Sequence, residues 1–156
     1  MNEEKFSTVF PTGAKNEAYA KYFVGQSYLN MLSLDQVVIG NVTFEPGCRN
    51  NWHVHHASEG GGQILVCVAG RGYYQEWGKE AIEMKPGDCI NIPPEVKHWH
   101  GAAPNEWFSH LAIEVPGKDG DNMPIGMQLI GKPLGEATLY RAGYAFETDY
   151  AGGANK

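Results

Sequence analysis

The sequence contains few of the residues that build disulfide frameworks, zinc ribbons or membrane-spanning helices. Its three cysteines, Cys48, Cys67 and Cys89, are odd in number and widely spaced along the 156 residues. Such a set argues against a disulfide framework or a zinc ribbon, and we expect Cys67 to be a small buried hydrophobic residue of a strand. No apolar run reaches the length of about 20 residues that a membrane-spanning helix needs.

Basic residues are scarce as well. The chain has 12 lysines and arginines against 18 aspartates and glutamates, which gives a formal net charge of −6 at pH 7. This acidic balance argues against nucleic acid or an anionic membrane as a partner. The first residues, Met1 to Lys5, do not show the basic and then apolar pattern of a signal peptide, which indicates a cytoplasmic protein.

Glycine, by contrast, is abundant at 20 residues, and 42% of the chain is hydrophobic. The length suits one compact domain with a core of its own. Many short strand-like runs separated by turn residues predict an all-β fold, either a closed barrel or a jelly roll. The expected strands are 22–25, 28–32, 37–44, a strand through His53 and His55, a strand from Gln63, 73–77, 81–84, 89–92 and 107–115.

The histidines carry the chemistry of the sequence. His53 and His55 are two positions apart, so on an extended strand their rings point to the same face and can share one cation. A third imidazole, His98, follows the turn at Gly87 and the extended exit at Pro93. His56 must point to the other face and is expected at the surface.

The spacing of these residues resembles the two motifs of the cupin superfamily. The matching residues are Gly47, His53 and His55 in the first motif and Gly87, Pro93 and His98 in the second. The resemblance covers about residues 37–115 and implies a jelly-roll β-barrel whose N-terminal strands lie at the interface of a homodimer. Glu95 and Ala102 stand where the second motif has glycine and asparagine, and we interpret both as ordinary drift.

The motif also implies a fourth ligand after His55, for which the sequence offers two candidates. Glu59 stands at the usual gap, but the glycine that the motif requires does not follow it at the right distance. Gln63 lies farther away, yet Gly70 follows it correctly, and Gln63 opens an apolar strand. We therefore interpret residues 58–62 as an insertion and favour Gln63 over Glu59.

A site of three imidazoles and one amide oxygen suits a divalent transition metal, and the ligand types alone do not choose among Mn, Fe, Zn and Ni. Because all four ligands are neutral, the ion keeps its full charge. It should therefore be a stronger Lewis acid than one bound by a carboxylate.

A narrower resemblance concerns residues 96–104 and 108–112. They are similar to small single-domain bacterial cupins, which include the manganese-dependent hydroxynitrile lyases and the carboxymuconolactone-decarboxylase-associated cupins. The metal ligands that this resemblance implies are His53, His55, Gln63 and His98. It also implies His100 and His110 as pocket histidines that move a proton, a role that suits imidazole. The longer gap before Gln63 departs from that family's pattern.

Three functions follow as hypotheses. The first is a metal-dependent lyase that acts on a small carbonyl or hydroxy compound, as the hydroxynitrile lyases do. The alternatives are a metal-dependent dioxygenase and a non-enzymatic cupin that binds a small molecule. Oxygen uptake by an iron form would distinguish the second, and a ligand-induced rise in melting temperature without product would distinguish the third.

The end of the chain departs from the barrel pattern. Residues 123–147 resemble the C-terminal end of amidase-signature enzymes, where a similar stretch forms a strand and then a helix. We expect a strand at 125–130 and a helix at 136–147. The Ser-Ser-Lys machinery of that family is absent, so no amidase activity is implied. The expected organisation is a barrel with an N-terminal arm at 1–116 and an extension at 117–156.

Overall fold

A computed structural model of the chain describes residues 6–119, and their regular structure is almost entirely β-strand. The prediction of an all-β jelly-roll barrel is confirmed. The strand expected at 125–130 and the helix expected at 136–147 lie outside the described residues. Within residues 6–119 no helix is long and apolar enough to cross a membrane.

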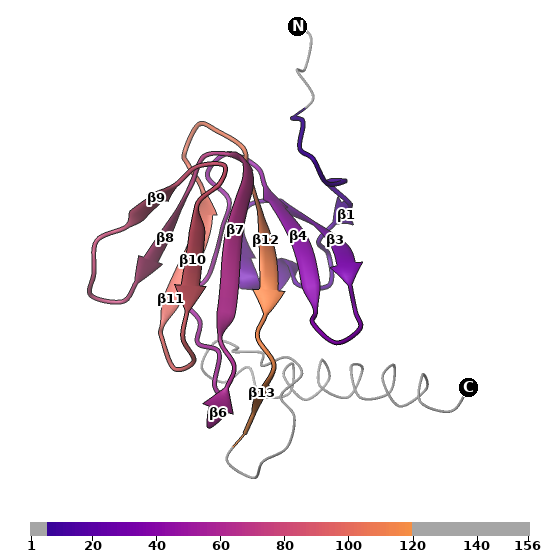
Figure 1. Cartoon of the computed structure of the whole chain (residues 1–156). Helices are drawn as coiled ribbons and strands as arrows, with labels where there is room; N and C mark the ends of the chain where they lie inside the picture. Colours follow the sequence, from indigo (N-terminus) through magenta and orange to yellow (C-terminus); the bar gives the residue numbers. More distant parts are fainter. Residues whose placement is uncertain (1–5, 120–156) are drawn as a thin grey trace, which may run out of the picture. The chain divides into compact units, whose positions relative to one another are not determined.

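The strands form two main sheets, in which every neighbouring pair is antiparallel (Figure 1). In order across the sheet, the six-stranded one contains β1 (Ala14–Lys15), β3 (Ser27–Ser33), β4 (Ile39–Phe44), β12 (Phe108–Glu114), β7 (Gln63–Gly70) and β10 (Cys89–Ile92). The five-stranded one contains β2 (Phe23–Val24), β5 (Arg49–Asn50), β11 (His98–Ala102), β8 (Gly72–Glu76) and β9 (Ile82–Met84).

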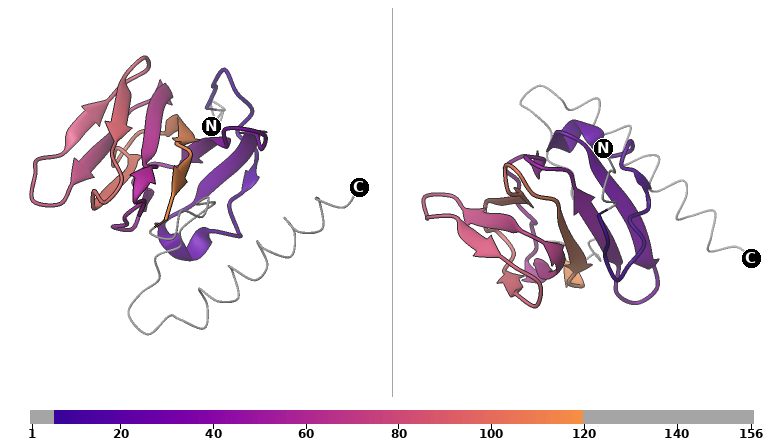
Figure 2. Two further views of the ribbon diagram at one scale, coloured as in Figure 1. Left: turned by 60° about the horizontal axis from the view of Figure 1, so that its bottom comes forward. Right: turned by 90° about the horizontal axis from the view of Figure 1, so that it is seen from above.

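The chain changes sheet repeatedly, from β4 to β5, from β7 to β8, from β9 to β10 and from β11 to β12. This alternation is typical of a jelly roll. Figure 2 shows from two further sides that the N-terminal strands and the strands between residues 70 and 100 lie on opposite sides of β12. His100 on β11 and His110 on β12 therefore belong to different sheets, and both side chains are buried.

The core lies between the two sheets, and the inward face of β7 forms part of it. Every second residue of β7 is buried, beginning with Gln63 and continuing through Leu65 and Cys67. Phe44 and Phe108 are fully buried beside them, and each such side chain contributes about 2–3 kcal/mol by leaving water. The expectation for Cys67 is confirmed. At one end of this apolar face the polar Gln63 takes the next inward position.

The segment between β5 and β7 corrects one prediction. His53 and His55 do not lie on a regular strand: His53 forms a single bridge to His98, and His55 lies outside any strand. The expected insertion instead contains β6 (Glu59–Gly60), which pairs with β13 (Gly117–Lys118). Its glycines at 60–62 all have positive φ, and a Cβ at Gly62 would clash with the Ile92 carbonyl oxygen.

Glu95 is more than a neutral replacement for the glycine of the motif. Its φ of 67° lies in the left-handed region that favours glycine. Its main-chain N–H donates to the His55 carbonyl at 2.9 Å. Its carboxylate accepts from His56 Nδ1 at 2.7 Å and from the Ala57 N–H at 3.0 Å, and the bond from His56 lowers the pKa of Glu95. Glu95 therefore anchors the irregular segment that carries His55, while His56 is exposed as predicted.

Two substitutions separate the strain at this position from the benefit of the carboxylate. Glu95→Ala and Glu95→Gly both lose the bonds to His56 and Ala57, but only alanine keeps a Cβ in the left-handed region. We expect the melting temperature of Glu95→Gly to exceed that of Glu95→Ala by about 5 °C. Calorimetry checks this, and equal melting temperatures would show that the backbone is not strained here.

Strand β3 and the residue that follows it carry exposed apolar side chains. Met31, Leu32 and Leu34 are 41%, 38% and 72% exposed. Such residues suit a surface that a second subunit covers. The homodimer that the family resemblance implies stays a prediction, which sedimentation equilibrium would test.

Candidate metal centre

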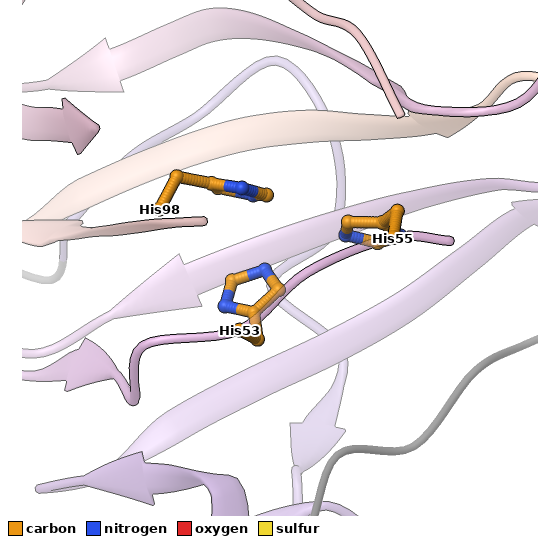
Figure 3. A group of neighbouring side chains, drawn as sticks. All are labelled: His53, His55 and His98. Atoms are coloured by element: carbon orange, nitrogen blue, oxygen red, sulfur yellow. The ribbon is translucent and has the colours of Figure 1, made fainter. Parts of the chain in front are cut away.

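Three imidazoles meet at one end of the barrel. The single bridge between His53 and His98 places these residues side by side, and His55 reaches the same space from the irregular segment. One ring nitrogen of each lies within 4.8 Å of those of the other two, so the group could hold a metal ion. Figure 3 shows the three rings turned toward a common space. The prediction that these histidines come together is confirmed, although the strand that was expected to carry His53 and His55 is absent.

The outer nitrogen of each ring faces a hydrogen-bond acceptor. His53 Nδ1 lies 2.8 Å from the Asn51 carbonyl oxygen, and His98 Nδ1 lies 2.8 Å from that of Val96. A carbonyl only accepts, so Nδ1 carries the proton in both rings and Nε2 keeps its lone pair. The Nε2 atoms of His55 and His98 are buried without a hydrogen-bond partner. Unpaired buried acceptors of this kind are what a metal ion would satisfy.

The three rings are held in the neutral form that binds metals. Burial lowers the pKa of His53 to about 3, and the nearby His98 adds to the effect. Burial also lowers the pKa of His55 and of His98 to about 4. At neutral pH all three rings therefore stay uncharged, and each keeps one ring nitrogen that carries no proton and can bind a cation.

Gln63, the predicted fourth ligand, is the first residue of β7 and only 5% exposed. Its Nε2 donates to the carboxylate of Glu114, and its Oε1 is buried without a partner. Glu59, the other candidate, is 69% exposed and lies 3.4 Å from Lys118 Nζ. The histidine group contains no carboxylate among the described residues. These positions favour Gln63, whose role as a ligand stays a prediction.

The two predicted pocket histidines are in contact with each other next to this group. His110 Nε2 lies 2.9 Å from His100 Nδ1, and the His100 ring centre is 5.6 Å from that of His53. Both are buried, and burial lowers the pKa of His100 well below its ordinary value and that of His110 to about 4. The pair is therefore neutral in the resting protein.

Two residues of the site were missed by the sequence analysis. Asn50 accepts from the His100 main-chain N–H at 2.9 Å, and its Nδ2 lies 3.0 Å from His100 Nε2. Glu114 Oε2 lies 3.5 Å from His55 Nδ1. Burial raises the pKa of Glu114, against the bond from Gln63. Alternation along the last strand puts Glu114, four positions after His110, on the same face, but nothing in the sequence indicates its partners.

The donor set fits a divalent transition metal. It offers imidazole nitrogens with free lone pairs and one buried amide oxygen without a partner. Such neutral nitrogen and oxygen donors suit manganese, iron, zinc and nickel alike, so they do not identify the ion.

A short stretch of the chain matches a protein unrelated to the barrel. Over 38 residues it is 58% identical to one of the subunits of the glutamyl-tRNA(Gln) amidotransferase of Staphylococcus epidermidis, which is 24% of this chain and 8% of that protein. This agrees with the resemblance of residues 123–147 to the C-terminal end of amidase-signature enzymes. The match is too short to carry that protein's activity over.

The barrel has relatives of its own. The (R)-mandelonitrile lyase of Granulicella tundricola is 47% identical over 74 residues, which are 47% of this chain and 53% of that protein, so the chain spans about half of that relative's length. The crystal structure of a cupin-like protein from Thermotoga maritima is 34% identical, with a TM-score of 0.61 over 81% of this chain and 92% of that one. Residues 40–113 match the Cupin domain family. The chain belongs to the cupins.

Proposed function

We propose that this protein is a metal-dependent lyase that cleaves cyanohydrins into a carbonyl compound and hydrogen cyanide. The observation that carries the proposal is a group of three neutral imidazoles directly beside a second, hydrogen-bonded pair of buried imidazoles. The first group can hold a cation and the second can hold a proton. The (R)-mandelonitrile lyase similar to the barrel supports this choice of reaction.

The residues that would hold the ion are His53, His55, Gln63 and His98. A divalent ion, manganese by resemblance, would supply Lewis-acid polarisation of a substrate oxygen. The protein contributes three ring nitrogens: main-chain carbonyls set the tautomers of His53 and His98, and the carboxylate of Glu114 lies near Nδ1 of His55. It also contributes burial, which strengthens electrostatic interactions in the pocket.

His100 and His110 would move the proton. In cyanohydrin cleavage the hydroxyl proton leaves, the carbon–carbon bond breaks, and its electron pair departs with cyanide. The carbonyl forms at the same carbon, and the proton ends on cyanide. Asn50 Nδ2 can only donate, so His100 Nε2 accepts from it and His100 Nδ1–H faces His110 Nε2. A proton taken up by this buried pair is costly, which favours its rapid transfer to the departing anion.

The proposal is tested by cleavage of mandelonitrile with protein reconstituted with Mn(II). A chelated sample serves as the control, and metal content is measured in both. We expect the loaded protein to release benzaldehyde and cyanide and the chelated sample to lose this activity. No cleavage of mandelonitrile or of aliphatic cyanohydrins by fully loaded protein would contradict the proposal and favour a cupin that binds a small molecule without turnover.

A further inference from the structure

Glu114 occupies a position that the proposed reaction does not use. It ends β12 directly opposite Gln63, the first residue of β7, in the antiparallel register of the two strands. One of its oxygens accepts from Gln63 Nε2, and the other lies 3.5 Å from His55 Nδ1. A single carboxylate therefore contacts the predicted amide ligand and one of the three imidazoles.

The contact with Gln63 selects the orientation of its amide group. A carboxylate accepts hydrogen bonds, so the NH₂ side of the amide faces Glu114 and the carbonyl oxygen faces away from it. The opposite orientation would bring the amide oxygen against a carboxylate oxygen. Gln63 Oε1 is the atom left buried and unpaired, and it is the only atom of this side chain that can bind a cation.

The carboxylate of Glu114 also lies near Nδ1 of His55, a position that favours a proton on that nitrogen. His53 and His98 have main-chain carbonyls behind them, whereas His55 has the carboxylate of Glu114. An acceptor behind Nδ1 keeps the proton there and leaves Nε2 free, and the buried Nε2 of His55 has no partner. A negatively charged acceptor also makes the imidazole a stronger electron donor.

We propose that Glu114 is a positioning residue of the metal centre, which turns the Gln63 carbonyl oxygen and the His55 Nε2 toward the ion. This inference rests on the proposed metal site. Glu114 lies outside the group of His, Cys, Asp and Glu side chains that could share a metal ion, which among the described residues contains His53, His55 and His98. It supplies a negative charge behind an otherwise neutral ligand set.

The test is a titration of metal-free protein with Co(II), followed by competition with a chelator and by the visible absorption spectrum of the bound ion. We compare wild type with Glu114→Gln and Glu114→Ala. The matched control is Glu59→Gln, which removes an exposed carboxylate that lies against Lys118. We expect Glu114→Ala to bind Co(II) about 10- to 100-fold more weakly and with an altered spectrum. Glu114→Gln keeps an acceptor and should lose less, and Glu59→Gln should match wild type.

The outcomes separate the two proposals. If wild type binds no Co(II) or Mn(II), the metal centre itself is contradicted. If wild type binds the ion and Glu114→Ala shows the same affinity and spectrum, the metal centre stands and the role of Glu114 is overturned. A spectral change is decisive because a purely structural weakening of the strand end would lower the melting temperature without altering the field around the ion.

A charge exchange tests the contact itself without any metal. Gln63→Glu alone places two carboxylates against each other and should lower the melting temperature of the metal-free protein. Adding Glu114→Gln restores one carboxylate and one amide, and we expect the double variant to recover most of the loss. If the two substitutions act independently on the melting temperature, the contact between these side chains does not form in solution.

Discussion

Replacing His98 by phenylalanine is expected to eliminate metal binding while leaving the barrel folded. His98 is fully buried, and its ring centre lies 4.2 Å from that of His53. Phenylalanine fills the same space without a ring nitrogen, so the ion loses one of its three imidazoles. Replacing a residue that hydrogen-bonds a metal ligand costs about 10- to 100-fold in metal affinity. Replacing a ligand itself should therefore cost at least about 1,000-fold.

Thermal unfolding with and without Mn(II) measures this effect. A ligand that binds only the folded state adds about 2.7 kcal/mol to the free energy of unfolding at 100 times its dissociation constant. Mn(II) should therefore raise the melting temperature of wild type and leave that of His98→Phe unchanged. His56→Gln is the matched control, because His56 is an exposed histidine outside the group. An equal gain for wild type and His98→Phe would show that the cation binds elsewhere.

The metal-free protein is expected to lose stability steeply as the pH falls below neutral, and His110 contributes a measurable share. Burial lowers the pKa of His110 from 6.5 to about 4 in the folded state. Between these values the unfolded chain takes up a proton that the folded protein refuses, so the free energy of unfolding decreases as the pH falls. For one such histidine the loss amounts to about 3 kcal/mol between about pH 7 and about pH 4.

Urea unfolding at a series of pH values isolates that share. In His110→Phe the loss of unfolding free energy between neutral and acidic pH should be smaller than in wild type by that amount. Met84→Leu, which replaces one fully buried core side chain that does not titrate by another, should lower stability equally at all pH values. Parallel curves for wild type and His110→Phe would contradict the shifted pKa.

Local spacing along the chain succeeded at some positions of the site and failed at others. Cys67 is a buried strand residue as we expected, because side chains of a strand point alternately to its two faces and Cys67 lies on the inward face of β7. The same rule failed for His53 and His55: they meet without a strand, since a single bridge to His98 and the anchor at Glu95 hold the segment. The spacing was informative, but the reason that we gave for it was wrong.

By itself the sequence determined the all-β class, the histidines that meet, and the preference for Gln63 over Glu59, because these depend on short-range spacing. Only the tertiary structure decided what stands behind the ligands. Gln63 and Glu114 are 51 positions apart, and Asn50 and His100 are 50 apart. Such partners are set by which strands pair and in which register, and that depends on how the whole core packs rather than on any local pattern.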